Sequence, residues 1–318
     1  MNLFLVTFES VSILLGIGLI GFYILKTRLL PLTILKSLNP LALDIALPSL
    51  IFVDILLDFT PSTYPDWWQY PLWWMIFTLF AFIATSLFRY LSKKETRNEF
   101  SISLFYQNGI FFPLAILTSM FAQPSAYVVP LFLFTIFYPA FFFSTYSFFF
   151  RNGSVKKQSI DLKKIFHPTL FATLTGIIIG LMGIQYLVPS IFTSILSMLG
   201  AMTVPLLMII LGGNIYLNYQ KGGFTHRMET IKFVLIKNIV FPLCFIGVLL
   251  VFQDYIPPTI AFIMFLQSAV PPVTAVPMVT ERMKGNHHLT SQFVMASFIF
   301  SLISLPTMVY VYLMFFSL

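Results

Sequence analysis

Apolar residues run through this chain in long blocks that short polar connections separate. A helix of about 20 apolar residues crosses about 30 Å of hydrocarbon, and ten blocks of this kind occur along the 318 residues. The pattern therefore predicts an all-α integral membrane protein with ten transmembrane helices. The predicted spans are residues 3–25, 38–58, 70–91, 101–121, 124–150, 168–188, 190–217, 232–252, 257–280 and 289–316.

The composition excludes an ordinary soluble domain. Hydrophobic residues make up 58% of the chain and charged residues 9%, with a mean hydropathy of +0.91. The bases behind the formal net charge of +7 are spread through short connections, so lipid headgroups are expected near them and nucleic acid is not an expected partner. No nucleophile, base and acid share one depth, and Cys244 is the only cysteine. We expect no enzyme, no cofactor and no metal site.

Basic residues follow the odd-numbered spans, and the even-numbered connections contain none. Positive side chains near span ends favour the cytoplasm, so both termini are expected on the extracellular or periplasmic side of a plasma (inner) membrane. Residues 151–166 are interpreted as a cytoplasmic linker. The bases that carry this prediction are Lys26, Arg28, Lys36, Arg89, Lys93, Lys94, Arg97, Arg151, Lys156, Lys157, Lys163, Lys164, Lys221, Arg227, Lys232, Arg282 and Lys284.

Five spans in each half place the halves in opposite orientations and favour an inverted repeat of residues 1–150 and 167–318. The fourth span carries QNGIFFP from residue 107, and the ninth carries QSAVPPVTAVP from residue 267. Pro48 and Pro205 also lie at comparable depth in the second and seventh spans. Paired interruptions of this kind mark a binding site near the membrane midplane.

Prolines explain why the fourth and ninth spans should break. Pro113, and Pro271 with Pro272, each remove a backbone donor and clash with the preceding turn. Non-helical backbone survives at this depth only inside protein or beside a wet cavity. We expect each second half-helix to begin near its proline and to aim free N–H groups at an anion. The alternative is a pair of ordinary proline kinks.

Several segments together resemble the auxin efflux carrier family, which includes plant auxin exporters and bacterial permeases for malate and related acids. They are NPLALDIALPSLIF, QNGIFFPLAIL, LGGNIYL, KNIVFPL and SAVPPVTAVPMVTERM, in the second, fourth, seventh, eighth and ninth spans. The resemblance covers essentially the whole chain. Ser268 and Ala269 precede the prolines where an Asn-centred motif is sought, and the long central loop of the plant exporters is absent, so a microbial permease is favoured over an auxin carrier.

The resemblance implies a fold similar to that of sodium/proton antiporters, with crossing helices four and nine. Spans one, two, six and seven would form a scaffold, and spans three to five and eight to ten a transport domain. The substrate carboxylate would lie at the crossing. Together with the dipole argument, this gives the expected substrate-binding residues Gln107, Asn108, Gly109, Pro113, Gln267, Ser268, Pro271, Pro272 and Lys237.

Ionisable residues inside spans are costly and therefore informative. Lys237 either extends its ammonium to the cytoplasm or attracts an organic anion. Asp44 either pairs with a base or accepts a proton, and Glu9 either contacts another helix or carries a proton. Asp44 and Glu9 are thus the candidates for proton or ion coupling.

The function expected from the sequence is secondary transport of small organic anions, such as malate or another carboxylate, by alternating access. A membrane sensor or receptor with a carrier fold is the alternative from another class, and a sodium-coupled symporter of the bile acid type is the third. Expected partners are the anion, the bilayer, a coupling proton or sodium ion, and a second copy in a homodimer.

Overall fold

The computed structural model describes residues 3–121, 125–150, 168–220 and 226–316. Its regular elements are helices, and no strand occurs among these residues apart from one isolated β-bridge. In the first half they are α1 (Leu3–Lys26), α2 (Ile34–Pro40), the π-helix η1 (Leu41–Ala46), α3 (Leu47–Asp58), α4 (Gln69–Phe88), η2 (Arg89–Leu91), η3 (Lys94–Thr96), α5 (Arg97–Phe105), α6 (Phe111–Met120), α7 (Ser125–Thr135), α8 (Tyr138–Thr145) and η4 (Tyr146–Phe150).

The second half is also helical throughout its described part. Its elements are α10 (Pro168–Met182), η5 (Gln185–Leu187), α11 (Ser190–Ala201), α12 (Thr203–Gln220), α13 (Arg227–Leu235), the π-helix η6 (Ile236–Val240), α14 (Phe241–Phe252), α15 (Pro258–Ala269), α16 (Val276–Arg282) and α17 (His287–Leu313). The predicted linker at 151–166, with its bases, and Lys221 lie outside the described residues.

Among the described residues, seven helices are long and apolar enough to cross a membrane. They match seven of the ten predicted spans. The regions 101–121 and 257–280 are each interrupted, which leaves α5, α6, α15 and α16 as shorter helices. The region 168–188 is shortened to the 15 residues of α10, about 22 Å at 1.5 Å per residue, because Gly183 adopts a φ of +67° and ends the helix.

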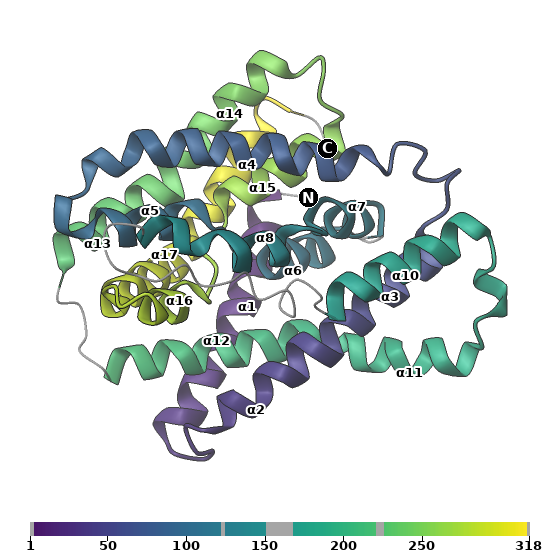
Figure 1. Ribbon diagram of the computed structural model, residues 1–318, viewed down its shortest axis with the longest axis horizontal. Helices are drawn as coiled ribbons and strands as arrows, with labels where there is room; N and C mark the ends of the chain where they lie inside the picture. Colours follow the sequence, from purple (N-terminus) through teal and green to yellow (C-terminus); the bar gives the residue numbers. More distant parts are fainter. Residues whose placement is uncertain (1–2, 122–124, 151–167, 221–225, 317–318) are drawn as a thin grey trace.

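Figure 1 shows α4 crossing the upper part of the molecule, below α14, and α12 with α11 crossing the lower part, above α2. The segments that join α3 to α4 and α10 to α11 lie at the right of this view, whereas α4 and α12 end at the left. The segment that follows α4 carries the bases Arg89 and Lys93, whereas the segments from α3 to α4 and from α10 to α11 carry none. The alternation of charges in the sequence predicts such a difference between the two ends of the spans.

Two helix pairs pack through glycine. A Cβ added to Gly212 of α12 would lie 1.7 Å from the carbonyl oxygen of Gly18 in α1, and one added to Gly21 would lie 2.2 Å from that of Ile209. In the other pair, α3 and α10, a Cβ on Gly180 would lie 2.9 Å from the carbonyl oxygen of Phe59. Small residues let membrane helices approach closely, so these glycines serve helix packing.

Candidate functional site

The fourth predicted span breaks at Tyr106, where the backbone becomes extended after α5. The QNG sequence that follows disfavours a helix, because Asn and Gly are poor helix formers. Gly109 has a second reason to be glycine: a Cβ there would lie 2.2 Å from Oε1 of Gln267. The chain resumes as α6 at Phe111, which makes Pro113 its third residue. The prediction that this half-helix begins near its proline is confirmed.

The ninth predicted span breaks at Val270, whose ψ of 153° is extended. Residues before a proline avoid the helical region, so Pro271 and Pro272 in sequence favour an extended segment. The second half-helix, α16, begins only at Val276 and has Pro277 in its first turn. The prediction that it begins near Pro271 or Pro272 is therefore wrong. Pro277 is the helix-start proline, and a proline's preference for the first turn could have indicated it.

The two interruptions pair with each other. Gln107 and Pro272 form an antiparallel bridge. The N–H of Asn108 donates to the carbonyl of Pro271 at 2.8 Å, and the N–H of Val273 donates to the carbonyl of Tyr106 at 3.0 Å. Backbone groups freed from the helices thus satisfy one another, as membrane burial demands. These two N–H groups are therefore bonded within the junction; they precede the first turns of α6 and α16, whose N–H groups are the ones that the sequence expects to face an anion.

Side chains complete the junction between the interruptions. Nε2 of Gln267 donates to the carbonyl of Gly109 at 2.6 Å, and the hydroxyl of Tyr138 in α8 donates to the carbonyl of Gln107. Gln107 and Asn108 are 3% and 2% exposed. Nevertheless Nε2 of Gln107 and Oδ1 of Asn108 have no hydrogen-bond partner among the described residues. One donor and one acceptor thus remain unmet at adjacent buried positions.

Unmet polar atoms of this kind are informative because they are expensive. A buried donor or acceptor without a partner costs about 1–3 kcal/mol. Native proteins contain few of them, and each calls for an explanation such as a ligand or an ordered water molecule. Gln107 and Asn108 can therefore form hydrogen bonds to a small polar ligand that reaches the junction.

Lys237 lies inside the protein. Its side chain is fully buried, and its Nζ donates to the carbonyl of Ser268 at 3.0 Å and lies 4.7 Å from the ring centroid of Phe241. Extension of the ammonium to the cytoplasm, one of the two sequence interpretations, is not what the structure shows. Ser268 precedes the last residue of α15, where helix carbonyls favour a cation.

Asn238, which sequence reasoning did not identify as functional, holds the segment next to Lys237. Its Nδ2 donates to the carbonyl of Ser297 at 3.0 Å and to Oγ of Ser304 at 3.2 Å, and its Oδ1 accepts from Oγ of Ser297 at 2.5 Å. Lys237 and Asn238 both belong to the π-helix η6, which Pro242 follows. A proline clashes with the carbonyl four residues earlier, and π-turns are frequent at functional sites.

Most of the predicted substrate-binding residues meet at the junction between the two interruptions, and Pro113 lies in the helix that follows the first one. Backbone or side-chain bonds join the two interruptions at Gln107, Asn108, Gly109, Gln267, Pro271 and Pro272, and Lys237 joins them through Ser268. Pro113 is buried in α6. The coupling candidates differ: Glu9 on α1 and Asp44 on η1 are both exposed. Exposure on α1 leaves the Glu9 carboxylate open to a contact with another helix or to proton carriage, the two alternatives from the sequence.

A family model described as "Membrane transport protein" matches residues 6–309. The chain belongs to this family, the auxin efflux carrier family. The resemblance inferred from short segments is thus confirmed over nearly the whole length. A search of curated proteins finds no match. Members of the family are transporters, and together with the seven apolar helices this makes the chain a multi-pass membrane protein.

Proposed function

We propose that this transporter carries small organic anions, such as malate or a related carboxylate, and binds them at the crossing of the fourth and ninth spans. The observation that carries the proposal is the unmet donor of Gln107 beside the unmet acceptor of Asn108, both buried. A hydroxycarboxylate offers both an acceptor and a donor. The buried ammonium of Lys237, one hydrogen bond from the interrupted ninth span, adds positive charge.

The site also needs a fold in which the crossing can move. We propose ten spans. Seven are the long apolar helices, and the other three are the pair α5–α6, the pair α15–α16 and the single helix α10, in which no continuous helix is long enough to be counted with the seven. Contacts support an inverted repeat. Spans one and seven pack as α1 on α12, and their repeat equivalents, six and two, pack as α10 on α3. Spans three and four likewise pack as α4 on α5, and their repeat equivalents, eight and nine, pack as α14 on α15.

Alternating access would follow from this division. Residues 1–150 and 167–318 would be the two repeats, with the scaffold from spans one, two, six and seven. The remaining spans would move as the transport domain. The helix α6, which follows the first interruption, contacts α1 of the proposed scaffold, so substrate at the interruption would lie close to the boundary between the domains.

Orientation and assembly belong to the same proposal. Both termini would lie outside a plasma membrane, because bases cluster at the end of α4 opposite the base-free connections. A cysteine at Ser62 should then react with an impermeant thiol reagent on intact cells, while one at Lys94 should not, in a background without Cys244. The reverse labelling would contradict the orientation. We also expect a homodimer, which measurement of the molecular mass of the purified protein tests directly.

Coupling to sodium is disfavoured by one contact. The ammonium of Lys237 already lies at the carbonyl of Ser268 near the C-terminal end of α15, where a coupling cation would otherwise be attracted. We therefore propose sodium-independent transport. Substitution of Glu9 and of Asp44, one at a time, tests whether either carboxylate couples transport to protons.

The test of the proposed function is flux in proteoliposomes. Carboxylates would first be screened by thermal shift on the purified protein, and the stabilising compounds would then be loaded as labelled solutes. Saturable uptake that persists without sodium is the expected result. Binding without flux would favour a membrane sensor instead, and flux abolished by sodium removal would favour a symporter of the bile acid type.

A further inference from the structure

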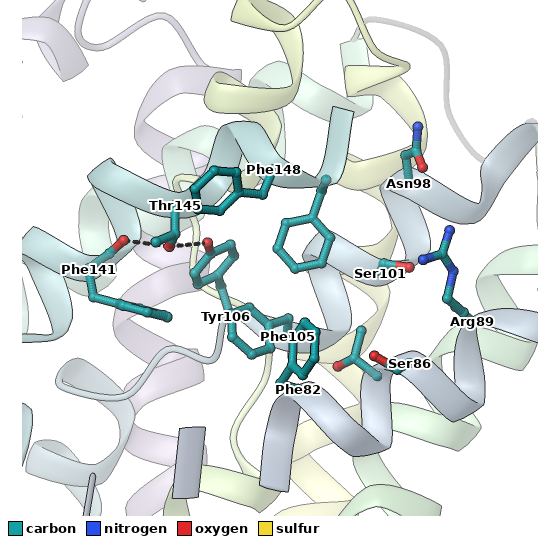
Figure 2. A pocket seen from close by; sticks show the side chains of 12 residues that line it. Phe82, Ser86, Arg89, Asn98, Ser101, Phe105, Tyr106, Phe141, Thr145 and Phe148 are labelled. Atoms are coloured by element: carbon teal, nitrogen blue, oxygen red, sulfur yellow. Dashed lines mark hydrogen bonds between the residues drawn. The ribbon is translucent and has the colours of Figure 1, made fainter. Parts of the chain in front are cut away.

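A cavity of about 430 Å³ lies between α4, α5, α8 and η4, on the side of α5 that leads to the first interruption at Tyr106. This volume falls within the range of about 300–1,000 Å³ typical of small-molecule sites. Figure 2 shows its lining divided in two: Ser86, Arg89, Asn98 and Ser101 on one side, and mostly aromatic rings on the other. The transport mechanism proposed above uses none of these four polar residues.

The polar side has hydrogen-bonding capacity that the protein does not use. Nε of Arg89 is buried without a hydrogen-bond partner among the described residues. The same holds for Oγ1 of Thr85, whose side chain is 3% exposed. No carboxylate lines the cavity. Glu99, which follows the lining residue Asn98, accepts instead from the N–H of Asn286 at 2.8 Å. A guanidinium that is always charged thus faces hydroxyl and amide groups without a counter-ion in the lining.

The aromatic side reaches the outer surface of the protein. Phe82 and Phe148, which line the cavity, are each 56% exposed, while Phe105 continues the apolar lining inward. In a membrane-spanning chain these exposed rings contact acyl chains. Arg89 follows the last residue of α4, at the basic end of that span, which is the level of lipid headgroups. The cavity therefore has one polar, cationic end at the interface and one apolar wall toward the bilayer.

We propose that this cavity binds one anionic phospholipid from the surrounding leaflet. Its phosphate would accept hydrogen bonds from Arg89 and from Ser86 or Asn98, and the first part of one acyl chain would lie along Phe82 and Phe148. Arg recognises phosphate through paired, charge-assisted hydrogen bonds, and basic pockets between transmembrane helices suit anionic headgroups. A soluble anion would leave the aromatic wall exposed to the bilayer without an occupant.

The bound lipid would also touch the transport machinery. Tyr106 lines the cavity, and its hydroxyl shares a hydrogen bond with Oγ1 of Thr145 at 2.7 Å (Figure 2). Its carbonyl accepts from the N–H of Val273 in the other interruption at 3.0 Å. A lipid that packs on the Tyr106 ring therefore stabilises a residue that directly joins the two interrupted spans.

The experiment measures lipid retention by the full chain. The protein is placed in phosphatidylcholine nanodiscs with a minor fraction of phosphatidylglycerol, released gently, and examined by native mass spectrometry. The wild type should retain one phosphatidylglycerol. Arg89→Gln should lower that retention roughly tenfold, as expected for loss of a charge-assisted hydrogen bond. Lys94→Gln removes the same charge from an exposed residue outside the lining and should leave retention unchanged.

A second variant keeps the test valid if Arg89→Gln folds poorly. Ser86→Phe preserves the charge but fills the polar end of the cavity, so it should also release the lipid. Unchanged retention in Arg89→Gln, or in a folded Ser86→Phe, would overturn the proposal. Equal loss in Lys94→Gln would show general surface attraction instead. Displacement of the lipid by soluble glycerol phosphate would show that a free phosphate, and not a phospholipid, is the ligand.

Discussion

The contact between α1 and α12 and the contact between the two interrupted spans both bring backbone against backbone, with opposite chemistry. In the first, Gly18 and Gly212 approach so closely that no Cβ fits, while each helix keeps its backbone bonds to itself. In the second, backbone groups are exchanged, as from Asn108 to Pro271 at 2.8 Å. Only the second leaves side-chain amide atoms unmet. Close packing thus joins the helices in one region, and in the other the unmet polar atoms support the proposed binding site.

The largest effect should come from the packed region. Gly212→Ala would place a Cβ 1.7 Å from the Gly18 carbonyl oxygen, and rigid backbone on both sides cannot move without separating the helices. We expect a destabilisation of about 3 kcal/mol or failure to fold, at or above the usual range for overpacking. The loss of stability is measured as the melting temperature, from size-exclusion chromatography of samples heated to increasing temperatures. Gly16→Ala in α1, the helix that α12 contacts, has no atom within 4 Å of the new Cβ and is the control. Equal stability of the two variants would contradict the packing account.

The next largest effect should separate folding from transport. Pro271→Ala with Pro272→Ala removes the restriction that keeps this segment extended, so α15 can continue and the bridge to Gln107 is lost. Flux should fall to background while the protein still inserts and purifies. Pro257→Ala with Pro258→Ala alters the exposed doublet at the start of the same helix and should retain flux. Loss of flux in both double variants would remove the special role of the interruption.

A smaller effect is expected from the buried cation. Lys237→Gln removes the ammonium that donates to the carbonyl of Ser268, so anion affinity should weaken about tenfold. The matched control is Lys232→Gln, because Lys232 lies on the same span, is 42% exposed and pairs with Glu229 at 2.8 Å. Titration calorimetry with the best carboxylate compares them. Equal affinities in both variants would mean that Lys237 serves structure alone.

Local chemistry explains what the sequence predicted well. The QNG segment and Pro113 indicated the first interruption, and the doubled proline indicated the second, because both are backbone properties of a few residues. The start of α16 was missed because two proline-containing segments, at Pro271 and Pro277, competed for the same role, and the fold uses the later one as the helix start.

Contacts between distant residues explain what the sequence did not predict. Gln267 reaches the carbonyl of Gly109 across 158 positions, and no local pattern specifies that pairing. For the same reason the backbone bonds from Asn108 to Pro271 and from Val273 to Tyr106 were not predicted. The direction of Lys237 was equally undetermined, because a lysine inside a span end can extend either way. Neighbouring helices, and not the segment itself, decide such orientations.

The most direct test of the central claim is anion affinity in Asn108→Ala. This substitution removes the unmet acceptor without adding volume, so the protein should keep its melting temperature. Loss of a hydrogen bond to a charged ligand costs about 1.5–3 kcal/mol, so carboxylate binding should weaken roughly tenfold to a hundredfold. Gln253→Ala, which removes an exposed amide beyond the end of α14, should bind as the wild type does. Wild-type affinity in Asn108→Ala would contradict a substrate site at the paired interruptions.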